Sequence, residues 1–416
     1  MCGICGIINI DGKKAEEFFI RNMMLKMKHR GPDDEGVYLN NNVGLGFVRL
    51  SILDLSTAGH QPMKSHDGRY VIIFNGEVYN FIELKAELKS KYDFTTGTDT
   101  EVILAAFQEW GEKCLDRFNG MFAFVIFDTH TKNIFGARDR YGIKPFYYYQ
   151  DANSFIFASE IDPILTVNKS KISPNEESIY NFLAHNRTDY NPNTFFNEIN
   201  KLDHGCFFTL SQDGLKIKKW YDLNERVSIA DQIGSSDQFS ELLIDSVNLR
   251  LRSDVPVGVC LSGGIDSSTI VKIISEKLHF KDVNSFSAIY NKGQKGDESN
   301  YIMSLNRPEA HSYFTKLDEN DFITDLDKLL EVHSEPFPGT AVYSQYKVME
   351  LAHGKVSVLL DGQGADEYLA GYHYFYGVYY KELIKQFQLM TFFNELVSYQ
   401  NTKPKVITVN FVLFFT

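Results

Sequence analysis

Met1-Cys2-Gly3-Ile4-Cys5-Gly6 opens the chain and places a cysteine directly after the initiator methionine. The side chain of Cys2 is small enough for an aminopeptidase to remove Met1, which would leave a cysteine with a free α-amine. Such an amine has a pKa of about 8, near enough to neutrality to accept the proton of the thiol. The stretch therefore predicts an N-terminal nucleophile that carries its own base.

Cys2 and Cys5 also form a C-x-x-C pair, the pattern of half a zinc site or of a redox motif. A zinc site needs two further ligands at matching spacing, whereas Cys114, Cys206 and Cys260 are isolated in the sequence and no H-x3-H pattern follows them. Burial as a small apolar side chain is the other ordinary role of a cysteine. The motifs further along the chain favour the nucleophile.

Composition narrows the class of protein. The chain has 416 residues, enough for two or three domains, and 44% of them are hydrophobic, which is typical of globular proteins. Its formal charge of −12 argues against nucleic acid or an anionic membrane as a partner. We find no signal-peptide pattern and no apolar stretch of the roughly 20 residues that span a bilayer. With five cysteines in a chain of this size, these features predict a cytoplasmic protein.

The two halves differ in their hydrophobic patterns. Residues 1–210 predict an α+β domain with αββα layers, because short β-patterned runs alternate with two helical patterns: strands at 70–74, 121–127, 146–149 and 155–158, and helices at 81–91 and 100–111. Residues 211–236 are polar and irregular, which predicts a linker. Residues 237–416 predict a parallel α/β domain, because strands at 255–261, 283–289 and 356–360 alternate with helices at 239–251, 267–277 and 343–352.

Four motifs of the first half supply partners for Cys2: R-G-P-D at 30–33, R-L-S-I-L at 49–53, F-N-G-E at 74–77 and T-D-T-E at 98–101. Cleavage of an amide needs donors aimed at the developing oxyanion, which an Asn75 side chain beside the Gly76 N–H can provide. A fork such as Arg49 can hold an α-carboxylate, and a carboxylate such as Asp99 can hold an ammonium. Each motif alone has an ordinary explanation as a turn or a surface charge.

Together, these motifs resemble those of the class II, N-terminal cysteine, glutamine amidotransferases across the first 200 residues. The resemblance implies an N-terminal-nucleophile hydrolase sandwich in which Cys2 attacks the side-chain amide of glutamine and releases glutamate and ammonia. It implies Cys2, Asn75 and Gly76 as catalytic residues, the last two forming the oxyanion hole. It also implies a glutamine pocket formed by Arg49, Leu50, Ser51, Ile52, Leu53, Asn75, Gly76, Glu77 and Asp99.

A second site is indicated by Leu261-Ser262-Gly263-Gly264-Ile265-Asp266-Ser267-Ser268, between a predicted strand and a predicted helix. The glycines allow positive φ and close backbone approach, and the N–H groups at the helix start can bind an anion. Asp266 is suited to hold magnesium on phosphates. The Walker pattern G-x-x-x-x-G-K-[ST] is absent from the sequence.

This loop resembles the pyrophosphate loop of the ATP pyrophosphatases (adenine nucleotide α-hydrolase-like enzymes). The stretch Asp361-Gly362-Gln363-Gly364-Ala365-Asp366-Glu367 resembles the second nucleotide loop of the asparagine synthases. The resemblance implies ATP as co-substrate and Mg²⁺ held by Asp266 and Asp366. The implied ATP-binding residues are Leu261, Ser262, Gly263, Gly264, Asp266, Ser267, Ala288, Asp361 and Gly362.

Both halves together resemble the glutamine-hydrolysing asparagine synthases. The resemblance implies that ammonia made at Cys2 crosses an apolar tunnel to a second site, where aspartate and ATP form β-aspartyl-AMP, and it suggests a homodimer.

Two features depart from the family pattern near the acceptor. Glu335-Pro336-Phe337-Pro338-Gly339-Thr340 has no basic residue where aspartate-using members carry an arginine, and Gln363 stands where many have glutamate. Another carboxylate as the acceptor is therefore an alternative.

The uncharged tail 406–416 replaces the family's longer C-terminal part, and we interpret it as a truncated or frameshifted end. Glutaminase activity alone, or a non-catalytic binding role, are the corresponding alternatives.

Overall fold

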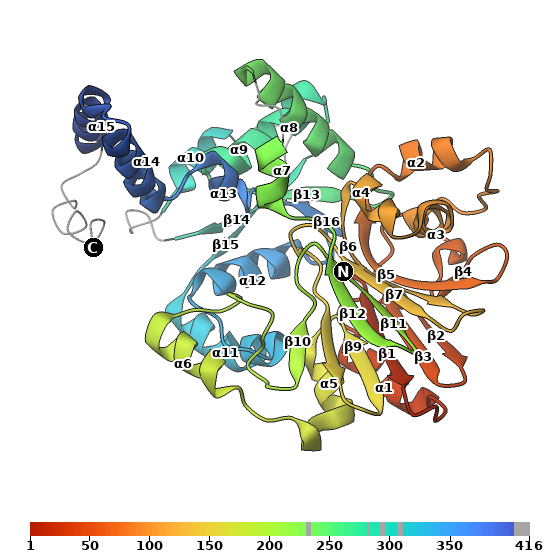
Figure 1. Ribbon diagram of the computed structural model, residues 1–416. Helices are drawn as coiled ribbons and strands as arrows, with labels where there is room; N and C mark the ends of the chain where they lie inside the picture. The colour runs from red at the N-terminus through yellow and green to blue at the C-terminus, as the bar shows by residue number, and fades with distance from the viewer. Residues whose placement is uncertain (230–233, 281–282, 291–296, 306–310, 403–416) are drawn as a thin grey trace.

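The computed structural model describes residues 1–229, 234–280, 283–290, 297–305 and 311–402 (Figure 1). Two antiparallel six-stranded sheets form the first domain. The first sheet has the order β10-β8-β9-β1-β3-β2 and consists of β1 Gly3–Asn9, β2 Asp34–Asn40, β3 Val43–Arg49, β8 Tyr147–Gln150, β9 Ser154–Ala158 and β10 Ile199–Lys201. The second has the order β12-β11-β7-β6-β5-β4 and consists of β4 Met63–Lys64, β5 Tyr70–Val78, β6 Gly120–Asp128, β7 Ile134–Arg138, β11 Cys206–Ser211 and β12 Gly214–Lys219.

The two sheets pack face to face because alternate residues of their central strands are apolar. Ile4 and Ile8 of β1 lie in the same buried cluster as Val71 and Ile73 of β5. Along each of these strands, residues two apart therefore point into the layer between the sheets. This periodicity also sets the direction of the polar side chains discussed below.

Helices cover both outer faces of this sandwich. α1 Glu17–Lys26 and α5 Ile161–Asn168 pack on the first sheet, and α2 Phe81–Leu88, α3 Asp99–Trp110 and α4 Cys114–Arg117 pack on the second. α6 Glu176–His185 follows α5. The predicted αββα domain is confirmed, and its predicted strands and helices correspond to elements of the structure.

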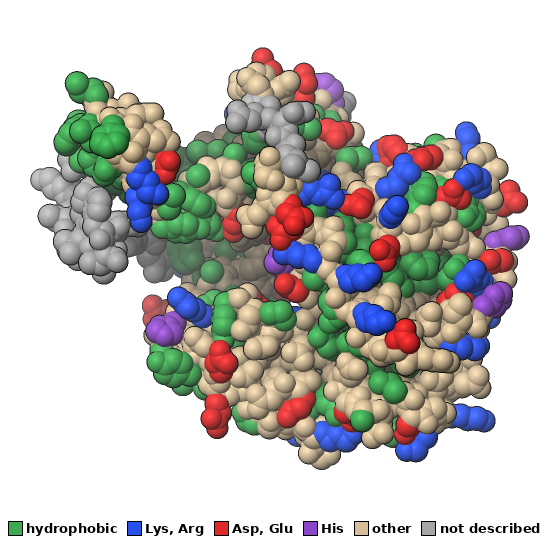
Figure 2. All heavy atoms as spheres, in the orientation of Figure 1, with side chains coloured by type: hydrophobic (Ala, Val, Ile, Leu, Met, Phe, Trp, Pro, Cys, Tyr) green, Lys and Arg blue, Asp and Glu red, His purple; other side chains and the backbone are tan. Residues whose placement is uncertain are grey.

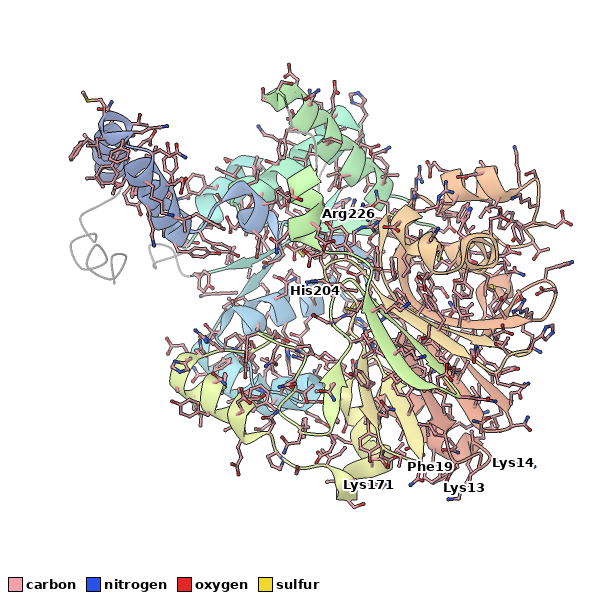
Figure 3. The ribbon with its side chains drawn as sticks, viewed as in Figure 1. Lys13, Lys14, Phe19, Lys171, His204 and Arg226 are labelled. Atoms are coloured by element: carbon pink, nitrogen blue, oxygen red, sulfur yellow. The ribbon has the colours of Figure 1, made fainter. Side chains whose placement is uncertain are left out.

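The prediction that residues 211–236 are irregular is wrong for most of that segment. Gly214, at φ 92°, allows a tight turn that pairs β12 with β11, and α7 Leu223–Ile229 follows. The polar character of β12 reflects its place at the sheet edge, where exposed lysines such as Lys216 and Lys218 discourage further pairing. Arg226 of α7 lies at the junction of the domains (Figure 3) and pairs with Asp116 of α4 at 2.7 Å.

The second domain is built on a parallel sheet of order β15-β14-β13-β16, which confirms the predicted α/β class. Its strands are β13 Val257–Cys260, β14 Asn284–Ile289, β15 His311–Lys316 and β16 Val358–Leu360. Its helices are α8 Ser236–Arg250, α9 Ile265–Lys272 with a π-helical continuation Ile273–Lys277, α10 Ser299–Leu305, α11 Glu319–His333, α12 Ala341–Ala352 and α13 Ala365–Leu369. α8 and α9 cover one face of β13, and α12 covers the other.

The last described helices, α14 His373–Lys385 and α15 Leu389–Thr402, extend away from the body (Figure 1). Hydrophobic side chains gather on their surface (Figure 2), among them the exposed Val378, Met390 and Phe393. The tail 406–416 lies outside the described residues. Within the described part of the chain, no helix combines the length and the apolar character needed to cross a membrane.

Candidate active sites

Cys2 lies immediately before β1 and is held by contacts on both sides. Its Sγ is 3.4 Å from the backbone nitrogen of Leu50 and 3.5 Å from the carbonyl oxygen of Leu50. The Nε of Arg30 donates to the carbonyl of Cys2 at 2.9 Å, and Arg30 is itself paired with Glu160 at 2.8 Å. Burial raises the pKa of the Cys2 thiol, whereas the Leu50 N–H and the N-terminal amine lower it. The contacts fix the thiol beside the start of the 50–56 loop.

Asn75 faces the same layer as Cys2. Cys2 precedes Ile4 by two residues and Asn75 follows Ile73 by two, so strand periodicity turns both side chains into the space between the sheets. Asn75 is 1% exposed, and its Nδ2 has no hydrogen-bond partner among the described residues. An unpaired buried amide is costly. This donor is therefore available to an oxygen brought in by a substrate.

Gly76 allows β5 and β6 to approach each other closely at this point. A Cβ at Gly76 would lie 2.3 Å from the carbonyl oxygen of Met121, a distance that side chains do not tolerate. The absence of a side chain leaves Gly76 in the wall of the pocket next to Asn75. Its backbone N–H and the Asn75 amide are the two donors that the sequence predicted.

One pocket brings together most of the predicted glutamine-binding residues. Its lining includes Cys2, Arg49, Leu50, Ile52, Leu53, Gly76, Glu77 and Asp99. Ser51 and Asn75 are not among its lining residues, although both adjoin residues that are. The backbone nitrogen of Ser51 donates to the Asp33 carboxylate at 2.7 Å. The lining also includes Phe74, Thr98 and Thr100, which belong to the motifs quoted above but were not predicted to bind glutamine. Phe47, Gly59 and Gln61 also line it, and the sequence did not indicate them.

Arg49 shapes the pocket through backbone contacts. Its guanidinium is buried and donates to the carbonyls of Leu53 at 3.2 Å, Asp54 at 2.6 Å and Ser56 at 2.9 Å. The side chain that was predicted to hold a substrate carboxylate thus holds the loop that forms one wall of the pocket.

Glu77 and Asp99 form a buried acidic pair at the pocket. Burial raises the pKa of Glu77 well above its usual range, and the charge of Asp99 raises it further. Burial also raises the pKa of Asp99, to about 7, against the opposing effect of hydrogen bonds such as that from the Val78 N–H at 2.8 Å. The pair is therefore suited to receive a cationic group, since an ammonium would compensate the buried negative charge.

The raised pKa of Asp99 predicts a pH-dependent stability. Between about pH 4 and pH 7 the folded chain holds a proton that the unfolded chain releases, so this contribution to stability is lost as the pH rises through that window. D99N removes the titration. We expect the melting temperature of the unchanged protein, relative to D99N, to be higher at pH 5 than at pH 8. An equal difference at both pH values would contradict the assignment.

Lys144 is a residue of this site that the sequence did not reveal. It is 5% exposed, and its Nζ donates to the Met1 Sδ at 3.2 Å. The buried carboxylate of Asp139 holds the surrounding loop by accepting from the backbone nitrogens of Lys144, at 3.0 Å, and Phe122, at 3.1 Å. Burial lowers the pKa of Lys144, and its charge in turn lowers the pKa of the Cys2 thiol. The available signal was R-D-x-x-G-I-K-P at 138–145, a patterned loop between two strands.

A cavity of about 510 Å³ lies at the carboxyl ends of β13 and β14, where open parallel sheets bind ligands. Of the predicted ATP-binding residues, Leu261, Ser262, Gly264, Asp266, Ser267, Ala288, Asp361 and Gly362 line it. Gly263 is outside the lining and makes the turn at φ 91°. The two predicted loops touch, because a Cβ at Gly362 would lie 3.0 Å from the Ser267 backbone nitrogen.

The lining of this cavity is negatively charged, which favours a phosphate that carries a bound cation over a bare phosphate. Its described lining includes the carboxylates Asp266, Glu298, Asp361 and Asp366 and no lysine or arginine. Such a lining would repel a bare triphosphate, whereas carboxylate oxygens are the ligands that Mg²⁺ prefers. The predicted metal residues Asp266 and Asp366 both line this cavity, but among the described residues no three His, Cys, Asp or Glu side chains are grouped closely enough to hold a metal ion.

The residues that depart from the family pattern lie in two parts of the structure. Thr340 and Gln363 line the cavity at the carboxyl ends of β13 and β14. Glu335 instead contacts the first domain, where its carboxylate accepts from the Phe195 N–H at 2.8 Å.

Comparison with known proteins gives matches to both halves. The family described as glutamine amidotransferase domain matches residues 1–221, and the family described as asparagine synthase matches residues 238–405. A putative asparagine synthetase (glutamine-hydrolyzing) 2 of Methanocaldococcus jannaschii is 40% identical over 401 residues, covering 89% of this chain and 76% of the relative.

Two asparagine synthetases (glutamine-hydrolyzing) of Bacillus subtilis, numbered 1 and 2, are 34% and 32% identical. These matches cover 90% and 89% of this chain, which spans 59% and 52% of the two relatives.

Proposed function

Because the chain belongs to the glutamine-hydrolysing asparagine synthetase family, we propose that it hydrolyses glutamine at Cys2 and uses the ammonia to amidate a carboxylate activated by ATP. The buried Asn75 amide, unpaired among the described residues and facing the same layer as Cys2, carries the first part of this proposal. The nucleotide cavity formed by both predicted loops supports the second.

Glutamine hydrolysis follows from the groups around Cys2. The α-amine takes the thiol proton, and the sulfur attacks the side-chain carbonyl carbon of glutamine. The oxyanion accepts from Asn75 Nδ2 and the Gly76 N–H. Collapse of this intermediate breaks the C–N bond, with the amine proton transferred to the departing ammonia. Water then cleaves the thioester to give glutamate and restores the thiol.

The environment of the N-terminus favours the basic form of the amine. With Met1 in place, burial lowers the pKa of the Met1 amine to about 6. Removal of Met1 exposes the α-amine of Cys2 next to this position, where burial would likewise disfavour the charged ammonium. The positive charge of Lys144 lowers the pKa of both the terminal amine and the Cys2 thiol, because it disfavours a nearby ammonium and favours a thiolate.

Replacing Lys144 with methionine is expected to raise the pKa of the nucleophilic group. The acidic limb of the kcat/KM profile for glutamine should move to higher pH, and activity at pH 7 should fall about tenfold for each pH unit that the limb moves. Activity should recover toward that of the unchanged protein at higher pH. Lys171, an exposed lysine paired with Asp151 far from this site (Figure 3), provides the control K171M, which should leave the profile unchanged. If the acidic limb lies at the same pH in all three proteins, the role of Lys144 is contradicted.

In the second domain, ATP would bind with its phosphates at the Ser262 loop, and Asp266 and Asp366 would hold Mg²⁺. When bound, the ion neutralises phosphate charge. The acceptor carboxylate displaces pyrophosphate to form an acyl-adenylate, and ammonia then displaces AMP to form the amide. Aspartate is the acceptor that the family implies. The neutral side chains of Thr340 and Gln363 in the cavity wall favour a second candidate, another carboxylate with fewer charges. A homodimer and a cytoplasmic location are part of the same proposal.

One assay separates these activities. The protein is incubated with glutamine alone and with glutamine, ATP, Mg²⁺ and aspartate, and glutamate, asparagine and AMP are quantified. Glutamate in the first mixture and all three products in the second are expected. Glutamate without AMP would restrict the activity to glutamine hydrolysis, after which a panel of other carboxylates tests the second candidate. The absence of glutamate in both mixtures would contradict the proposal.

A further inference from the structure

The loop at 50–56, which forms one wall of the glutamine pocket, depends on side chains for its position. It belongs to no sheet and contains Asp54 at φ 53°, a left-handed conformation that aspartate tolerates better than most residues. Within the first domain, Arg49 holds its carbonyls, and the Gly97 N–H donates to the Asp54 carboxylate at 2.8 Å. These contacts restrain the loop from the side of its own domain.

Two further hydrogen bonds to the loop come from the second domain. The backbone nitrogen of Asp254 donates to the carbonyl of Ile52 at 3.0 Å, and the carboxylate of Asp254 accepts from the Asp54 N–H at 2.8 Å. These two bonds bracket Leu53, whose side chain lines the pocket. Asp254 therefore fixes the segment between Ile52 and Asp54 at two points.

Arg252, two residues before Asp254, anchors the same segment to the chain just after β5. Arg252 donates to the carbonyl of Tyr79 at 2.6 Å and forms a two-point pair with Glu83 at 2.6 and 2.7 Å. Tyr79 directly follows β5, two residues after Glu77. The segment 252–254 thus contacts both the 50–56 loop and the chain just after β5. β13 begins only three residues after Asp254 and leads to the Ser262 loop.

We propose that Asp254 is a positioning residue for glutamine, contributed by the nucleotide-binding domain, which holds the 50–56 loop in the conformation that closes on the substrate. This inference rests on the proposed glutaminase function. Asp254 contacts neither Cys2 nor Asn75 in the described hydrogen bonds, so its loss should affect binding and spare the chemical step. Glutamine affinity in the first domain then depends on a residue of the second.

The test is glutaminase kinetics of the full chain carrying D254A or D254N. D254A removes the acceptor for the Asp54 N–H, and we expect KM for glutamine to rise about five- to tenfold with kcat within about twofold. D254N keeps an acceptor oxygen at the same place and should restore most of the affinity. The control D318A removes a carboxylate that accepts a backbone N–H, that of Asn320 at 2.8 Å, in the same domain but at the start of α11. It should leave KM unchanged.

The outcomes separate this inference from the proposed function. No glutamate from the unchanged protein would contradict the proposed function itself. Hydrolysis by the unchanged protein with the same KM in D254A would overturn the role of Asp254 alone. An equal rise of KM in D254A and D318A would also overturn it, because the effect would then come from general destabilisation. Melting temperatures of all four proteins show whether each variant is folded.

Discussion

Cys2→Ala is expected to abolish glutamine hydrolysis, with a loss of at least about 10⁴-fold in kcat, because the reaction loses its nucleophile and no other group can form the thioester. Alanine is as small as cysteine, so Met1 should still be removed and the α-amine exposed as before. Only the sulfur is then missing from the site. Glutamate release, measured over hours at saturating glutamine, gives the residual rate.

The control for this variant is C5A. Cys5 lies on β1, three residues after Cys2, but in the cluster on the outer face of the first sheet, and it is fully buried. Truncating it costs stability, as other large-to-small changes in a core do, yet it should leave kcat for glutamine within a few-fold. Equal losses in C2A and C5A would show that the effect is structural. Substantial hydrolysis by C2A would remove the basis of the mechanism.

Asn75→Ala is expected to lower kcat about 10²- to 10³-fold with a much smaller change in KM, because its donor is needed where charge develops in the transition state. The substitution also removes a buried amide that lacks a partner among the described residues. The folded protein should therefore lose little stability, in contrast to its large loss of rate. Steady-state kinetics and thermal unfolding of the same preparation measure both quantities.

Asn168 provides a closely matched control. It is also buried, and its Nδ2 also lacks a partner among the described residues, but it ends α5 on the outer face of the sandwich. N168A should leave kcat unchanged. If N75A retains more than about a tenth of the original kcat, the oxyanion is stabilised elsewhere and Asn75 has another role.

The sequence predicted much of this arrangement because its chemistry is encoded in short motifs. Asn75 and Gly76 are adjacent, and the nucleotide loop lies within a single strand-turn-helix unit, so local patterns were sufficient to locate them. The alternation of apolar residues likewise predicted the central strands. Only the tertiary structure, however, placed the side chains of Cys2 and Asn75 in one layer.

Residues that lie far apart in the sequence but close in the fold were missed, because only the tertiary structure brings them together. Lys144 reaches the N-terminus only because the sheets pack face to face, and Asp254 precedes a strand in what resembles an ordinary turn. Gln61 lines the pocket through hydrogen bonds to Thr100, at 3.2 Å, and to the Phe74 N–H, at 2.7 Å, which no local pattern indicates. The edge strand β12 was mistaken for part of a linker because its lysines gave it a polar composition.

The central claim, that Cys2 becomes an N-terminal nucleophile for glutamine, is tested most directly by trapping it. The purified protein is incubated with 6-diazo-5-oxo-L-norleucine, a glutamine analogue with an electrophilic carbon at the position of the amide, and its N-terminal peptide is analysed by mass spectrometry. We predict a peptide that begins at Cys2 and carries one covalent adduct on its sulfur, with excess glutamine protecting against labelling. A peptide that retains Met1, or an adduct found on another cysteine, would contradict the account.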